Sequence, residues 1–174
     1  QVQPIERSTV PRGAQGVEML RLTFVRPCGG AETPIPIEEI HLQRKGLGFS
    51  SDIAGVYVVG EGDRLSSRAV VARSGALDVR LRGVTLRPCD TVPLHVVVDF
   101  SADASVAGEH RFELRGSAPI LAPGAILEIA SFPALLSTAH ISPYRSGVVS
   151  VADLELPSRV RYGGGQVVSR IAAT

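Results

Sequence analysis

The sequence contains no tryptophan and no asparagine, and Lys45 is its sole lysine. Without asparagine the chain has no acceptor for N-linked glycans. Carbohydrate-binding modules commonly stack sugars on flat aromatic rings, and here only Tyr57, Tyr144 and Tyr162 supply such rings besides the phenylalanines. The scarcity of aromatic residues lowers the expectation of a glycan-binding surface.

The chain also lacks an excess of either charge, because 18 basic and 17 acidic residues leave a net charge of +1. Proteins that bind nucleic acids usually carry a concentrated positive excess, so we expect no nucleic-acid partner. No apolar run is long enough to cross a bilayer, so we expect no membrane span. The chain opens on Gln1 rather than methionine. Removal of a signal peptide would give such a start, and so would trimming of the chain.

Cysteine is nearly absent as well, and both copies, Cys28 and Cys89, follow the dipeptide Arg-Pro. Two thiols cannot form a four-ligand zinc site alone, and the sequence has no Cys-x-x-Cys. We predict a disulfide between them, which would stabilise the fold by about 4 kcal/mol on the chain-entropy model and which favours an extracellular location. The alternative is a pair of buried, reduced thiols.

Apolar residues recur at every second position, which turns alternate side chains to opposite faces of a strand. The pattern predicts an all-β, antiparallel β-sandwich of the immunoglobulin-like or jelly-roll-like kind, with about ten short strands. The strands are expected at residues 17–25, 36–43, 53–60, 64–72, 77–82, 94–100, 111–115, 125–130, 147–156 and 166–172.

Two connections have a more specific signature. Gly60-Glu61-Gly62-Asp63 predicts a hairpin turn, since glycine tolerates positive φ. Residues 133–139 are the best helical candidate, but proline at position 143 follows soon after, so we expect at most one helical turn.

The hydrolytic and nucleotide-binding templates are not matched. Gly48-Phe49-Ser50-Ser51-Asp52 fails the serine-nucleophile pattern at its last position, and no P-loop or complete dinucleotide motif is present. The histidines do not form a zinc-protease helix motif; they are scattered at His41, His95, His110 and His140. The chain is therefore predicted not to be an enzyme, and no cofactor is expected.

Calcium is the one metal that the sequence could bind. Asp99, Asp103 and Glu109 could offer hard oxygen ligands at the exit of a strand. The alternative is that these acids form turns by hydrogen bonding to their own backbone, as acids in such positions commonly do.

The pattern predicts a row of arginines on one sheet, because Arg80, Arg82, Arg111 and Arg115 all fall on the charged side of their strands. Such a row could bind a carboxylate or an anionic glycan. The competing interpretation pairs these arginines with Asp78 and Glu113 across strands as an ordinary solvated surface.

The two ends of the chain resemble each other, because residues 10–20 and 160–171 both read as valine, arginine, a glycine loop, glutamine and a strand. This similarity predicts an internal repeat that is cut short, or two unrelated junctions. We divide the chain into an N-terminal arm (1–15), a sandwich (16–156) and a C-terminal strand (157–174) on a glycine hinge. The hinge is Gly163, Gly164 and Gly165, and the predicted assembly strand contains Gln166, Val167, Val168 and Ile171.

Several of these strand runs together resemble secreted bacterial and archaeal immunoglobulin-like modules of surface layers, pilus-like fibres and adhesins. The resemblance covers about residues 13 to 116. It is carried by residues 17–24, 35–40, 52–59, 94–99 and 107–110.

The resemblance implies a structural subunit of an extracellular filament or surface coat. Copies of the chain would assemble head-to-tail into a homopolymer by strand complementation, in which a terminal strand of one copy pairs with an open sheet edge of the next. The alternatives are an extracellular adhesin that binds a cell-surface glycan or protein, and one repeat of a longer surface protein.

Overall fold

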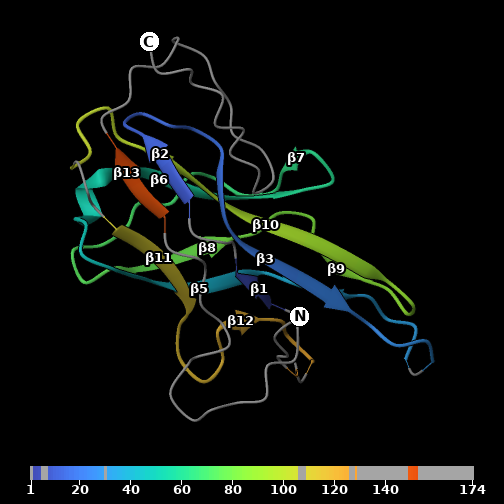
Figure 1. The fold of residues 1–174 in the computed structure, drawn as a ribbon. Helices are drawn as coiled ribbons and strands as arrows, with labels where there is room; N and C mark the ends of the chain where they lie inside the picture. Colours follow the sequence, from blue (N-terminus) through green and yellow to red (C-terminus); the bar gives the residue numbers. More distant parts are fainter. Residues whose placement is uncertain are drawn as a thin grey trace, which may run out of the picture.

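The computed structural model of the chain describes residues 2–4, 8–29, 31–105, 109–125, 128 and 149–152. Within these residues almost all regular structure is β-strand, arranged as a β-sandwich of two principal sheets with a small third sheet (Figure 1). The predicted all-β fold class is therefore confirmed. No helix in this described part of the chain has the length and apolar character needed to span a membrane.

The first sheet has the strand order β1-β3-β10-β6-β7, and every neighbouring pair in it is antiparallel. In Figure 1 its two longest strands, β3 and β10, run side by side. The strands are β1 (Val2–Pro4), β3 (Val17–Val25), β6 (Ile53–Gly60), β7 (Asp63–Arg64) and β10 (Thr91–Phe100).

The second sheet has the order β12-β5-β11-β13-β2, and β8 pairs with the other side of β5. Its strands are β2 (Ser8–Pro11), β5 (Glu39–Lys45), β8 (Ala76–Arg80), β11 (Glu109–Leu114), β12 (Ile120–Leu121) and β13 (Val149–Ala152). Strand β5 is central to this sheet, because β8 lies along one side of it and β11 and β12 share the other. The pair β2 and β13 is parallel, so the sheet is mixed at that end.

A third sheet consists of β4 (Ile35–Pro36) and β9 (Thr85–Leu86), and the predicted disulfide lies near it. Cys28 follows β3, Cys89 precedes β10, and the two sulfur atoms are bonded. The disulfide therefore joins the ends of two paired strands, as the sequence predicted.

The core lies between the two principal sheets, where the period-two pattern places the apolar side chains. Its fully buried members come from both sheets. Burial of each large apolar side chain stabilises the fold by roughly 1.5–3 kcal/mol. They include Met19, Leu20, Leu22, Val56, Val58, Leu94, Val96 and Val98 from the first sheet and Ile40, Leu42 and Phe112 from the second.

The predicted hairpin is present at the end of β6. Gly60 pairs with Asp63, which leaves Glu61 and Gly62 as the two turn residues, with φ values of 50° and 91°. Positive φ at both positions is the geometry of the two-residue turn that matches strand twist.

The boundaries of β3 and β6 agree with the prediction, but the segment 64–72 does not form the predicted strand. Only Asp63–Arg64 is strand, followed by isolated bridges at Ser66 and Ala69. Alternation along residues 94–100 predicts that Val97 and Asp99 face solvent, opposite the apolar side of the strand. Both side chains are instead buried, at 7% and 4% exposure, and the carboxylate of Asp99 contacts Arg68 and the backbone N–H of Gly16.

The N-terminal arm supplies one strand to each principal sheet, β1 and β2. At the other end of the chain, β13 falls within the predicted strand 147–156. The hinge at 163–165, the predicted assembly strand at 166–172 and the helical candidate at 133–139 lie outside the described residues.

Candidate functional site

The outer surface of the second sheet is built from charged and polar side chains on three adjacent strands, β8, β5 and β11. Alternation along β5 sends Ile40 and Leu42 into the core and His41 to the outside. The strand register places Asp78 directly opposite His41, and the backbone of Arg115 donates a hydrogen bond to the carbonyl oxygen of His41 on the other side. We call this surface the β5 face; it comprises Glu39, His41, Gln43, Asp78, Arg80, Arg111, Glu113 and Arg115.

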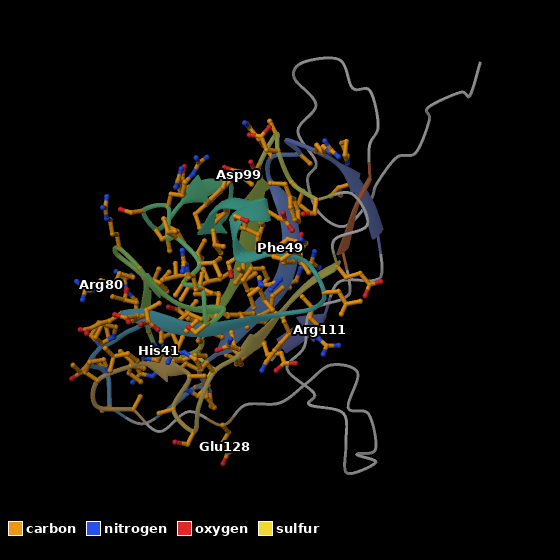
Figure 2. The ribbon with its side chains drawn as sticks, turned by 90° about the vertical axis from the view of Figure 1, so that its left-hand side faces the viewer. His41, Phe49, Arg80, Asp99, Arg111 and Glu128 are labelled. Atoms are coloured by element: carbon orange, nitrogen blue, oxygen red, sulfur yellow. A yellow bond between two sulfur atoms is a disulfide. The ribbon has the colours of Figure 1, made fainter. Side chains whose placement is uncertain are left out.

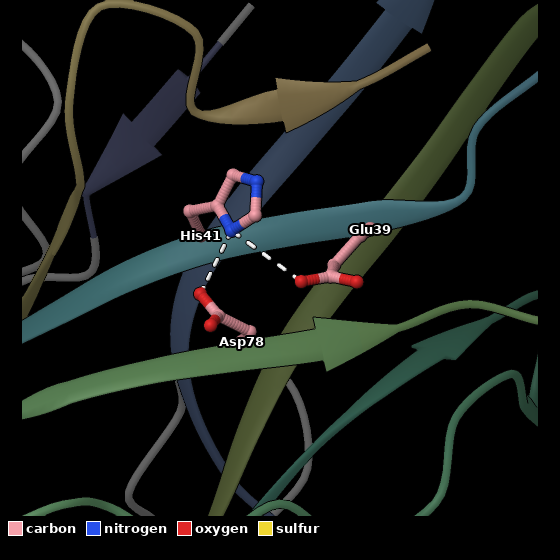
Figure 3. A group of neighbouring side chains, drawn as sticks. All are labelled: Glu39, His41 and Asp78. Carbon is pink, nitrogen blue, oxygen red and sulfur yellow. Dashed lines mark hydrogen bonds and ion pairs between the residues drawn. The ribbon is translucent and has the colours of Figure 1, made fainter. Parts of the chain in front are cut away.

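Ionic contacts connect five of these side chains in a row around His41. The Nδ1 atom of His41 lies 2.7 Å from Oδ1 of Asp78 and 3.5 Å from Oε1 of Glu39 (Figure 3). At the two ends of the row, Nε of Arg80 lies 3.3 Å from Oε2 of Glu39, and Arg115 forms an ion pair with Asp78. The row is therefore Arg80, Glu39, His41, Asp78 and Arg115, with positive ends and an acidic centre.

The contacts hold the carboxylate of Asp78 in its charged form. The hydrogen bond from His41 lowers the pKa of Asp78 most, and the guanidinium of Arg115 lowers it further. The carboxylate is half-exposed, at 48% for its side chain, while Glu39 is 14% exposed. The acidic centre is thus anchored on the sheet but open to solvent on one side.

The arginine row that the sequence predicted is only partly assembled. Arg115 pairs with Asp78 of another strand, as the interpretation of an ion-paired surface expected, whereas Arg111 lies 3.8 Å from Glu113 of its own strand. Arg82 lies beyond the end of β8 and donates a hydrogen bond to Ser67 instead. Figure 2 labels Arg80, His41 and Arg111 on this sheet, where Arg80 extends away from the ribbon.

A second cluster of similar composition is buried where β5, β11 and η1 (Ser50–Asp52) meet. It consists of Arg44, Asp52 and His110, and His110 has no exposed surface. Nη1 of Arg44 lies 3.3 Å from Nδ1 of His110, and Oδ2 of Asp52 lies 3.3 Å from Nε2 of the same ring. The second contact is an ion-pair distance that does not meet hydrogen-bond geometry.

This arrangement fixes the protonation state of His110. A guanidinium group can only donate, so Nδ1 accepts and the ring proton lies on Nε2, towards Asp52. Burial of the ring, with the charge of Arg44 beside it, lowers the pKa of His110 to about 4. His110 is therefore a neutral, structural histidine at physiological pH.

Asp52 connects this buried cluster to the loop that precedes it. Its carboxylate accepts hydrogen bonds from the backbone N–H of Phe49 (2.7 Å) and of Ser105 (2.9 Å). Burial opposes ionisation, but these hydrogen bonds outweigh it and the pKa of Asp52 is lowered. The loop so fixed carries two large apolar side chains that face solvent, Leu47 (84% exposed) and Phe49 (65% exposed, labelled in Figure 2).

The three acids predicted to bind calcium are not brought together. The carboxylate of Asp99 contacts the backbone N–H of Gly16, the hydroxyl of Tyr57 and the guanidinium of Arg68. Asp103 is exposed and Glu109 half-buried. In the described part of the chain, the histidine and acid side chains whose donor atoms converge are instead Glu39, His41 and Asp78. The geometry does not support a calcium site at the predicted residues.

In the sequence, His41 is one of four scattered histidines, and no motif links it to Glu39 and Asp78. Alternation along residues 39–43 and 77–82 places His41 and Asp78 on the solvated faces of their strands, which was the available signal. The missing information was the register that sets these two residues opposite each other.

Comparison with known proteins adds one structural similarity. The sequence matches no protein-family model and none of the curated proteins. Among solved structures, the fold is similar to the seventh ScaB type I cohesin from Pseudobacteroides cellulosolvens, with a TM-score of 0.33 and 10% sequence identity, over 92% of this chain and 97% of that one. A TM-score this low indicates a loose resemblance in shape, so no residue or activity is transferred from it.

Proposed function

We propose that the chain is an extracellular, non-catalytic binding module that holds a protein partner on the β5 face. The extracellular location is supported by the disulfide between Cys28 and Cys89, since disulfides persist in oxidising compartments. Binding to a protein is favoured over binding to a glycan because the face offers charged groups rather than a row of aromatic rings.

The proposal is supported by the row of five ion-paired side chains, four of them from β8 and β5 and the fifth, Arg115, directly after β11. Each member is held in place by its neighbours, so little conformational entropy is lost when a partner with complementary charges docks. Arg80 at one end is 89% exposed in its side chain and can form a paired, two-point contact with a partner carboxylate. Leu121 (44% exposed), opposite Glu39 on β12, adds an apolar contact at the same edge.

A charge reversal on the face tests the proposal. The immobilised wild-type chain is first used to capture a partner from the proteins secreted by the organism that encodes the chain. The captured protein is then identified, purified and titrated by calorimetry against the wild type, Arg80→Glu and Arg87→Glu. Arg87 is an exposed arginine outside the face, so its reversal changes the net charge equally. We expect Arg80→Glu to weaken binding at least about tenfold, as loss of a complementary charge does, and Arg87→Glu to leave it unchanged. Equal affinity of all three proteins would reject the β5 face as the binding surface.

Assembly of copies by strand complementation is the second candidate. It is favoured by the parallel pairing of β2 with β13, because these strands from opposite ends of the chain complete one edge of the second sheet. A strand supplied by a neighbouring copy could occupy the same position as β13. In this candidate function the chain is a subunit of an extracellular filament or coat.

Negative-stain microscopy and light scattering of the purified chain separate the two candidates. Strand complementation predicts filaments for the full chain and folded monomers for a variant that ends at residue 162. Monomers for the full chain over a wide concentration range would remove this candidate and leave the binding module.

A further inference from the structure

Three side chains at the centre of the β5 face aim their donor atoms at a common point. Glu39, His41 and Asp78 each offer one ligand atom, and these three atoms lie within 4.8 Å of one another. Figure 3 shows the imidazole nitrogen of His41 directed between the two carboxylates, one from its own strand and one from β8. We propose that this trio binds a divalent transition-metal ion, with Zn²⁺ as the best match to its ligands.

The distances fit such an ion. Zn²⁺ binds histidine nitrogen and carboxylate oxygen at about 2.0–2.2 Å in tetrahedral geometry, which places neighbouring ligand atoms about 3.3 Å apart. The two measured separations from Nδ1, 2.7 Å and 3.5 Å, lie on either side of that value. The two nitrogen–oxygen separations are therefore compatible with ligands of one bound ion.

The ligand set selects the class of metal. Imidazole nitrogen with carboxylate oxygen suits Zn²⁺ and its first-row neighbours, whereas Ca²⁺ and Mg²⁺ prefer a shell of oxygen atoms alone. Two paired strands position the ligands. Glu39 and His41 are two residues apart on β5, and Asp78 is the direct partner of His41 on β8. The trio is thus set by the sheet register rather than by a flexible loop.

The surrounding arginines shape the site. Arg80 contacts Oε2 of Glu39 and leaves Oε1 facing His41, which is how an outer residue orients a ligating carboxylate. Arg115 contacts the same Oδ1 atom of Asp78 that His41 contacts, so it competes with the ion for that atom. With three protein ligands and Asp78 half-exposed, a fourth position is open to water or to a side chain of a bound partner.

The histidine on the opposite sheet provides a matched control. Nδ1 of His95 lies 3.0 Å from Oε1 of Glu18, so this histidine also faces a carboxylate. It is not part of a group of three converging ligands among the described residues. A site that depends on the trio therefore requires His41 and not His95.

Calorimetric titration of the tag-free chain with Zn²⁺ tests the inference, with His41→Gln and Asp78→Asn as site variants and His95→Gln and His140→Gln as controls. We expect one saturable ion per chain, affinity lowered on the order of 10–100-fold or more in each site variant, and no change in either control. Circular dichroism melting establishes that each variant is folded. Absence of saturable binding, or binding that survives both site variants, would overturn the proposal. Because the titration uses the chain alone, its result is independent of whether the β5 face binds a protein.

Discussion

The fold places two clusters of arginine, histidine and acidic side chains on or beside β5, one largely buried and one on the surface. Asp52 and His110 are buried, with Arg44 half-buried beside them, while His41 and Asp78 lie on the β5 face with arginines next to them. In the buried cluster every group serves to neutralise another or to fix the adjacent loop. On the surface, the same groups keep access to solvent. Burial, rather than residue type, separates the structural cluster from the one available for binding.

Removal of the buried imidazole should give the largest effect. His110→Ala leaves a cavity beside Phe100 and exposes Arg44 and Asp52 to each other without the ring between them. We expect a loss of about 3–5 kcal/mol in the free energy of unfolding, as when a fully buried ring is truncated to alanine. Urea denaturation of His110→Ala and His41→Ala measures the contrast. Equal losses for the two variants would show that burial does not distinguish them.

A fall in pH should have the second-largest effect on the free energy of unfolding, because it acts on the buried His110. The pKa of His110 is lowered to about 4 in the folded chain, below its ordinary value near 6.5, so the unfolded chain takes up the proton first. The free energy of unfolding keeps its full value above about pH 6.5, where His110 is neutral in both states. It decreases by about 3 kcal/mol as the pH falls towards 4. Denaturation curves from pH 4 to 7 for the wild type and His110→Phe test this. The variant should lack this part of the pH dependence, and an unchanged slope would contradict the assignment.

Substitution of Gly48 tests the contact between the 46–49 loop and the buried cluster. A Cβ atom at Gly48 would lie 2.3 Å from Cε1 and Nε2 of His110 and 3.0 Å from Oδ2 of Asp52, so the ring must move. We expect Gly48→Ala to destabilise the fold by roughly 1–3 kcal/mol through overpacking. Gly62→Ala, which meets nothing within 4 Å but has a φ of 91°, is the control. Gly48→Ala should also raise the measured pKa of His110, because it displaces the ring from its buried position, whereas Gly62→Ala should leave that pKa unchanged.

Substitution on the β5 face should give the smallest effect on stability. Arg115→Gln removes an ion pair from a half-exposed carboxylate, and exposed pairs contribute about 0–1 kcal/mol. The same variant should tighten Zn²⁺ binding, because Arg115 competes for Oδ1 of Asp78. A large loss of stability with unchanged metal affinity would assign the face a structural role like that of the buried cluster.

Much of the fold was predictable because short-range patterns dictate it. Alternation set the bounds of β3 and β6, and Gly60 and Gly62, on either side of Glu61, marked the hairpin. The wrong or missing strand predictions have a common origin, because long-range contacts determine the structure of those segments. The segment 64–72 has a strand-like composition, but it passes the edge of β6 through single bridges at Ser66 and Ala69 only. The pairs β4 with β9 and β5 with β12 are too short to leave a pattern.

The candidate site was less predictable for the same reason. His41 and Asp78 are separated by 37 residues and meet only through the register of β5 and β8. His110 could have been assigned to the interior, since it alternates with the charged residues Arg111 and Glu113. Its charged neighbours Arg44 and Asp52 come from other elements, and no local pattern identifies them.

Nuclear magnetic resonance of the histidine side chains during addition of Zn²⁺ tests the distinction between the two clusters most directly. The account predicts that the ring-nitrogen signals of His41 shift and saturate at one ion per chain, while those of His110 remain those of a neutral ring with its proton on Nε2. Shifts at His110, or an unaltered His41 in the presence of excess metal, would contradict it.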